Sequence, residues 1–255
     1  AAHVAAGLPV SRTVLDMDRS QWTVLFAAWL GWGFDMFDSL LFNYVAPTCV
    51  PVLLHIPLGT PAAGAATLRW TGILTSLLLL GWAAGGILFG RVADRIGRSR
   101  TLLLTMTMYS VGTAACAFAP NIWSLVLFRV IASLGIGGEW VAGAAMVAEI
   151  VPEKRRVDAG ALLYTAAPMG LFLATFLVYQ IQGVYFRGTP EVAWRYVFLT
   201  GLIPAFVVIV VRLMIREPER WTKVVEKARP ARIAELFTPA YVALTVADSG
   251  PGIPP

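Results

Sequence analysis

The chain has 255 residues, of which 58% are hydrophobic and 14% are charged, and its mean hydropathy is +0.71. A water-soluble domain of this size needs far more polar surface, so the composition excludes one and indicates a protein with several membrane-spanning segments. The formal net charge of +5 would by itself also suit a nucleic-acid-binding protein. The positions of the basic residues along the chain decide between these two explanations.

Six apolar segments are each long enough to cross a membrane. A span needs about 20 mostly apolar residues, and it must be helical because backbone groups in lipid have no water to bond. In chain order the predicted spans are Trp22–Ala46, Thr71–Phe89, Thr101–Ala119, Ile122–Val147, Val157–Ile181 and Trp194–Ile215. The sequence therefore predicts an all-α membrane protein whose six-helix transmembrane domain occupies residues 21–215.

The basic residues concentrate on one side of these spans. Fifteen of the 20 Lys and Arg residues fall in four places: the N-terminal arm at 1–20, the connections after the second and fourth spans, and a basic linker at 216–239. Because positively charged segments stay in the cytoplasm, both termini are predicted to be cytoplasmic, in a plasma membrane of the bacterial inner-membrane type. Topology explains the basic excess, and no nucleic-acid partner is expected. The one long outer connection runs from Pro47 to Leu68.

Ionisable side chains inside spans are energetically expensive and mark candidate functional residues. Asp35 and Asp38 lie on one face of the first span, whereas Arg129 and Glu139 lie in the fourth. At about 1.5 Å per residue, Asp35 and Arg129 are both about 20 Å from the cytoplasmic side, so we expect them to be level. Glu139 lies nearer the cytoplasmic mouth, where it could relay a proton or pair with a basic loop. Tyr164 in the fifth span is a further cavity candidate.

These side chains suit proton coupling. Burial disfavours the charged form of a carboxylate and a nearby guanidinium favours it, so moving Arg129 would switch the proton affinity of an adjacent aspartate. Arg129 could instead hold a substrate carboxylate through its planar fork of donors. The alternative is a static Asp–Arg pair that only fixes helix packing.

Two stretches, GRVADRIGRSR and RVIASLGIGGEWVAGAAMVAEIVPEKRR, carry a resemblance to a known family. The first lies between the second and third spans and resembles the loop signature of the major facilitator superfamily at Gly90, Asp94, Arg95, Gly97, Arg98 and Arg100. The second resembles the fourth-helix pattern of that family at Arg129, Gly135, Gly137, Gly138, Glu149, Pro152 and Arg156. The first span and the Gly-Gly-Glu-Trp segment resemble the aromatic-acid, sialate and metabolite:proton symporter branches. Ser99 departs from the signature, which usually has a basic residue there.

The resemblance covers about Gln21–Arg232 and implies an architecture. Members have two six-helix halves, each built from two inverted three-helix repeats, so this chain would be the N-terminal half and would lack its C-terminal partner. The loop at Gly90–Arg100 would form an inner gate. In it, Asp94 would pair with the inner end of the fourth span, which carries the matching residues Glu149, Pro152 and Arg156, and would dock against the other half.

The predicted function is secondary active transport by alternating access, with proton-coupled symport of a small organic acid or sugar-like metabolite. Asp35, with Asp38, would carry the proton, and Arg129 would control it. The expected partners are the substrate, H⁺ and the lipid bilayer. No cofactor or metal is expected, and no His, Cys or Ser constellation in the spans suggests an enzyme. The alternative is a six-span sensor or anchor that feeds a cytoplasmic ATPase or kinase domain, because the atypical tail at 240–255 includes VADSGPGIPP, which resembles a nucleotide-binding loop of histidine-kinase-type ATPases.

Overall fold

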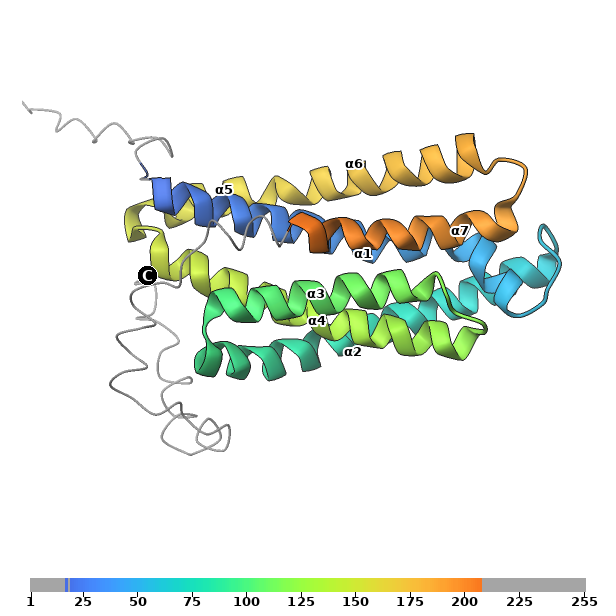
Figure 1. The fold of residues 1–255 in the computed structure, drawn as a ribbon, viewed down its shortest axis with the longest axis horizontal. Coiled ribbons are helices and arrows are strands. Elements are labelled where there is room, and N and C mark those ends of the chain that lie inside the picture. Colours follow the sequence, from blue (N-terminus) through green and yellow to red (C-terminus); the bar gives the residue numbers. More distant parts are fainter. Residues whose placement is uncertain (1–16, 18, 208–255) are drawn as a thin grey trace, which may run out of the picture. The chain divides into compact units, whose positions relative to one another are not determined.

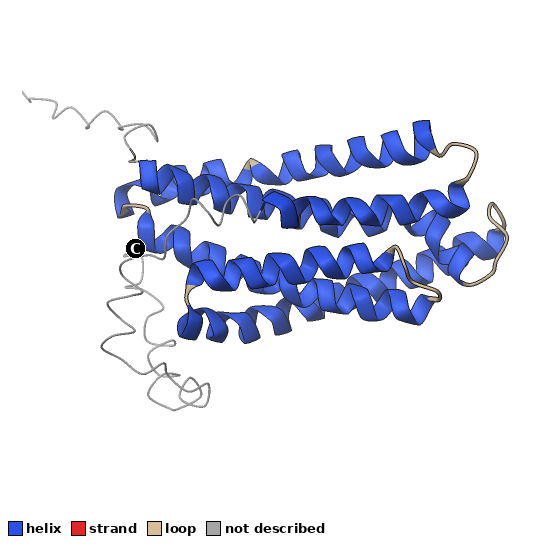
Figure 2. Ribbon diagram, viewed as in Figure 1, coloured by secondary structure: helices blue, strands red, loops and turns tan. Residues whose placement is uncertain are grey.

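The computed structural model describes residue 17 and residues 19–207, whose regular elements are helices joined by short connections (Figure 1, Figure 2). The first four helices are α1 (Arg19–Leu53), α2 (Pro61–Ile96), α3 (Arg98–Cys116) and α4 (Ile122–Ile150). After a 3₁₀ turn at Glu153–Arg155 come α5 (Arg156–Tyr164), α6 (Ala166–Val178), a π-helical segment (Tyr179–Tyr185), α7 (Pro190–Leu199) and a second 3₁₀ turn (Thr200–Leu202).

The long helices alternate in direction, so their connections alternate between two ends (Figure 1). The start of α1, the turn between α2 and α3, and the junction between α4 and α5 lie at one end. The other end holds the connections from α1 to α2 and from α3 to α4 and the loop before α7. The basic stretches at 91–100 and 154–156 therefore share one end, an arrangement compatible with the predicted cytoplasmic side.

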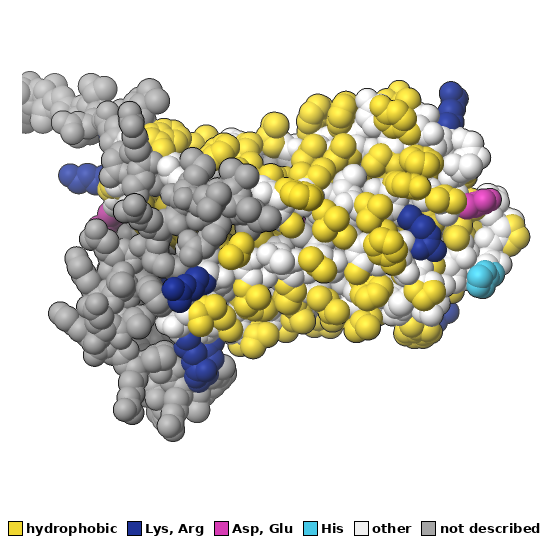
Figure 3. Space-filling model, in the orientation of Figure 1, with side chains coloured by type: hydrophobic (Ala, Val, Ile, Leu, Met, Phe, Trp, Pro, Cys, Tyr) yellow, Lys and Arg dark blue, Asp and Glu magenta, His cyan; other side chains and the backbone are white. Residues whose placement is uncertain are grey.

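Four helical stretches are long and apolar enough to cross a membrane: Gln21–Leu53, Pro61–Ile96, Ile122–Ala148 and Glu153–Tyr185. They confirm long apolar helices at the first, second, fourth and fifth predicted spans. On the face in Figure 3, hydrophobic side chains cover the middle and charged side chains lie toward the two ends. A protein with this surface belongs in a membrane, where exposed apolar side chains contact lipid rather than water.

The third and sixth predicted spans are not among these four stretches. α3 occupies the third, but it is not among the four because its 19 residues include two arginines and four threonines. Three of the four threonine hydroxyls donate to a backbone carbonyl one turn earlier; Thr105, for example, donates to the Thr101 carbonyl at 2.9 Å. The sixth span begins in α7, and its predicted end at Ile215 lies outside the described residues. A six-span domain thus stays a prediction.

The outer connection is shorter than the predicted Pro47–Leu68. α1 continues to Leu53 and α2 already begins at Pro61, so most of this segment is helical. Proline is well tolerated in the first turn of a helix. Thr60 caps α2 by accepting a hydrogen bond from the Ala63 amide at 3.2 Å. The prolines, glycines and alanines of this segment therefore extend the two helices and leave only a short loop between them.

The fifth predicted span is an interrupted helix rather than a single regular one. α5 ends at Tyr164 and α6 begins at Ala166. The interruption follows from Pro168, which has no amide hydrogen and whose ring crowds the carbonyl four residues earlier, at Tyr164.

Glycines let α4 approach α2 and α3 closely. A Cβ added at Gly137 would collide with the backbone carbonyl of Trp82 in α2, and one added at Gly135 would lie 2.7 Å from the Thr105 carbonyl in α3. α4 accordingly packs more extensively on α2 and α3 than on α1. The glycine cluster of the predicted fourth span is a packing surface, which holds α4 in a fixed orientation beside α1.

Candidate functional site

Four ionisable side chains are buried between α1 and α4. The exposed fractions are 4% for Asp35, 0% for Asp38, 3% for Arg129 and 4% for Glu139. α1 supplies the two aspartates and α4 supplies the arginine and the glutamate. A charge buried this deeply is stable only with a close partner, and a group without one tends to be neutral.

Arg129 forms its ion pair with Asp38. Its Nη1 donates to Asp38 Oδ2 at 3.3 Å, and the guanidinium lies 5.7 Å from the centre of the Phe42 ring. The Thr113 hydroxyl of α3 lies beside the Asp38 carboxylate. Counting residues placed Asp35 level with Arg129. Depth along a helix does not show, however, which of the two aspartates on the same face of α1 contacts Arg129. Asp38, three residues further along α1, is the one within reach.

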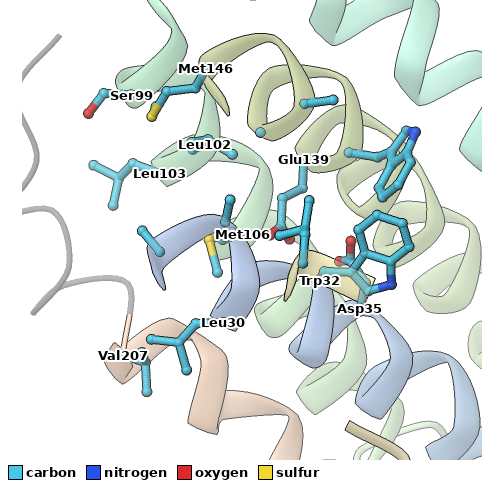
Figure 4. A pocket seen from close by; sticks show the side chains of 16 residues that line it. Leu30, Trp32, Asp35, Ser99, Leu102, Leu103, Met106, Glu139, Met146 and Val207 are labelled. Atoms are coloured by element: carbon cyan, nitrogen blue, oxygen red, sulfur yellow. The ribbon is translucent and has the colours of Figure 1, made fainter. Parts of the chain in front are cut away.

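Asp35 instead faces Glu139. The two carboxyl groups lie within hydrogen-bonding reach of each other, and Figure 4 shows the side chains extending toward each other from α1 and α4. Gly31 makes room for this contact, since a Cβ added there would collide with Glu139 Oε1. Within the described part of the chain, Glu139 makes no ion pair with a basic loop, which was one of the two roles that the sequence left open.

A pocket opens beside these two carboxyl groups (Figure 4). It offers about 60 Å³ of space to water-sized molecules, which is room for several waters. Apart from Ser99 and the two acids, its walls are mainly aliphatic and aromatic, with Leu30, Leu102, Met106 and Met146 among the lining residues.

An aromatic cluster forms one wall of the pocket. Trp32 of α1 packs edge-on against Trp140 of α4, with ring centroids 3.9 Å apart, and against Tyr164, at 4.8 Å. Tyr164 is 65% exposed and does not itself line the pocket. The two tryptophans were missed by the sequence analysis. Their signal was their position in the middle of predicted spans, away from the interfacial belt where tryptophan is common.

The predicted gating residues lie at the turn between α2 and α3. Gly97 has φ of 106°, a conformation that favours glycine, and it lets α3 follow α2 directly. Asp94 Oδ1 accepts a hydrogen bond from Arg98 Nη1 at 2.6 Å across this turn. Gly90 lies against α4, and Arg95 and Arg100 are exposed.

The inner end of α4 is closed by a different contact from the predicted one. Arg156 Nη2 donates to the Ala148 carbonyl at 3.2 Å, so it satisfies one of the last carbonyls of α4, and Pro152 follows the helix. Among the described side chains, which do not include that of Glu149, Asp94 pairs with Arg98 and not with this end of α4. The short connection explains the preference, because Gly97 alone separates α2 from α3 and keeps Asp94 and Arg98 close in space.

Comparisons with known proteins agree with the resemblance in the sequence. The model of the Major Facilitator Superfamily matches residues 22–248. A putative metabolite transport protein of Haemophilus influenzae is 34% identical over 79% of this chain and 45% of its own length. The niacin transporter NiaP of Acinetobacter baylyi is 32% identical over 77% of this chain and 41% of its own length. The chain spans about half the length of the curated relatives it matches.

The fold is also similar to a solved structure. The proton:xylose symporter XylE of E. coli superposes with a TM-score of 0.67 at 19% identity, over 80% of this chain and 46% of that one. The family match continues past Arg232, where the resemblance was expected to end, and reaches the first part of the tail. Because the relatives are transporters, the alternative of a sensor or anchor feeding an ATPase or kinase domain has no support.

Proposed function

The chain belongs to the major facilitator superfamily, a family of membrane transporters and not of enzymes, and we propose that it forms the N-terminal six-helix half of a secondary active transporter. Relatives of about twice its length support this proposal. In it, α1–α3 and the helices from α4 onward are two inverted three-helix repeats. The arm at 1–20, the linker at 216–239 and the tail at 240–255 lie on the cytoplasmic side of a bacterial inner membrane.

The transported substrate is, in this proposal, a small organic acid that moves together with protons. The observation that carries it is the buried pair of Arg129 and Asp38. The Arg129 guanidinium could leave Asp38 and hold a substrate carboxylate by two parallel hydrogen bonds. A proton taken up by the neighbouring buried acids would compensate the charge of the substrate, so proton and substrate would bind together.

The aromatic wall narrows the substrate class. Trp32 and Trp140 offer indole surface beside the buried acids. Flat apolar groups stack on such rings, so an acid with a ring is favoured over a sugar-like metabolite. NiaP, one of the relatives above, is named as a transporter of niacin, which is an acid of this type.

Uptake into proteoliposomes tests the proposed function. The intact transporter should accumulate small aromatic carboxylic acids when the pH gradient drives protons inward, and a protonophore should abolish the accumulation. The 255-residue chain alone should give no uptake, because alternating access requires two halves that move about a shared site. Accumulation of neutral sugars in place of acids, or accumulation without a pH gradient, would contradict the proposal.

The turn between α2 and α3 is proposed to be an inner gate. Asp94 lies at its exposed surface and holds Arg98, so the pair can exchange partners when another protein surface docks there. Exposed charges of this kind contribute little to folding stability. They can still decide which of two conformations of the transporter is favoured when each offers them different partners.

Asp94→Asn should therefore slow transport severalfold and leave the melting temperature almost unchanged. Asp158→Asn is the matched control, since Asp158 is also a half-exposed acid beside an arginine, Arg155, at 4.0 Å. Initial rates of uptake in proteoliposomes, compared at equal protein density, measure the difference. Equal rates for the two variants would mean that the loop is only a turn.

A further inference from the structure

Asp35 and Glu139 form a pair of buried carboxyl groups that lacks a cation. Arg129, the cation in this part of the protein, is engaged by Asp38. Asp35 Oδ1 and Glu139 Oε2 are buried, and no donor among the described residues bonds to them. Two carboxylates at this distance repel each other, and a hydrogen bond between two carboxyl groups exists only when one of them carries a proton.

The surroundings of the pair favour one proton rather than none. α1 adds a third acid, Asp38, and the cation nearby, Arg129, is already engaged by it. α3 adds the fully buried Tyr109 hydroxyl, which lies beside Glu139 and can stabilise one negative charge there as a donor. A doubly charged pair would lie in a mainly apolar site without compensation, which is costly.

We propose that Asp35 and Glu139 hold one proton between them, and that this shared proton is the one that the transporter couples to its substrate. The shared proton is argued independently of the proposed function. Its coupling to the substrate rests on that function. Binding forms one O–H bond on either carboxyl group, and the other accepts the hydrogen bond. Release returns the proton to water in the pocket, which both residues line. Asp38, fully buried and ion-paired, has no comparable access.

Infrared spectroscopy of the purified intact transporter tests the shared proton directly. At neutral pH the wild-type spectrum should contain the carbonyl stretch of a protonated carboxyl group. The band should disappear in both Asp35→Asn and Glu139→Gln, because each leaves a single carboxylate that accepts a hydrogen bond from an amide. Asp158→Asn, which removes an exposed acid, should keep it. A wild-type spectrum without the band, or a band that survives either substitution, would overturn the proposal.

A glycine substitution tests the same pair without removing an acid, in case the charge variants do not fold. Gly31→Ala places a Cβ against Glu139 Oε1 and should push the two carboxyl groups apart, so the band should shift or vanish. Gly160→Ala is the control, since a Cβ there meets nothing within 4 Å, and its spectrum should match the wild type. An unchanged band in Gly31→Ala would contradict a shared proton.

Transport separates this inference from the function on which its second part rests. Glu139→Gln should lose accumulation driven by a pH gradient as completely as Asp35→Asn, and the double variant should be no worse than either. Wild-type accumulation in Glu139→Gln would overturn the coupling role. If the wild-type protein ignores pH gradients while the infrared band behaves as expected, the proposed proton symport fails and the shared proton stands.

Discussion

Arg129→Gln should destabilise the protein by about 3–5 kcal/mol and abolish transport, because it leaves the fully buried Asp38 carboxylate without its cation. Adding Asp38→Asn to the same molecule removes the stranded charge and should restore much of the lost stability. Thermal unfolding of the purified intact transporter in detergent measures both effects.

The control for this experiment is Arg187→Gln. Arg187 is exposed in the loop before α7, and a substitution at such a surface position changes stability by at most about 0.5 kcal/mol. Transport by the double variant then distinguishes two roles for the buried pair. If Arg129 holds substrate, the stabilised double variant should still fail to transport. If the double variant recovers both stability and transport, the pair serves helix packing alone and the alternative of a static pair is correct.

Asp35→Asn should abolish uphill uptake driven by a pH gradient while sparing exchange of substrate across the membrane. Uphill uptake needs net movement of a proton with the substrate, and asparagine cannot take up that proton. Exchange returns a loaded carrier in each direction and needs no net proton movement. The substitution keeps the size of the side chain, which is 4% exposed, so folding should be little affected.

Counterflow and gradient-driven accumulation, measured in the same proteoliposomes, report the two activities separately. Asp158→Asn should leave both intact. Should Asp35→Asn and Asp38→Asn each accumulate substrate like the wild type, the coupled proton binds at neither aspartate. If both variants fail to insert in the membrane or to fold, the aspartates are structural.

Local properties of the sequence were enough to predict the class of protein and to select the residues of the candidate site. Long apolar runs form helices in a membrane whatever surrounds them, since the bilayer leaves backbone groups no other partner. Asp35, Asp38, Arg129 and Glu139 could be selected for the same reason, because an ionisable group in such a run is expensive wherever its neighbours lie. The glycine at position 97 likewise marked a real turn, and its φ of 106° explains why glycine occurs there.

Helix ends were predicted less well, because they depend on capping and on proline position rather than on hydropathy. Pro47 lies inside α1 and Pro61 starts α2, so the same residue type continues one helix and begins another. In the fifth span, Pro168 interrupts the helix one turn before its own position, an effect that an average over a window of residues does not register.

Only the tertiary structure decided which buried groups meet. Residue counting gives depth along one helix, but a partner depends on how two helices face each other, and that is set by close contacts such as Gly137 against Trp82 and Gly31 against Glu139. Those contacts turn α4 so that Arg129 meets Asp38 and Glu139 meets Asp35. The sequence by itself indicated three buried acids and one buried base. Packing alone made them an ion pair and a carboxyl pair, because distance and desolvation, not sequence spacing, determine which charges compensate each other.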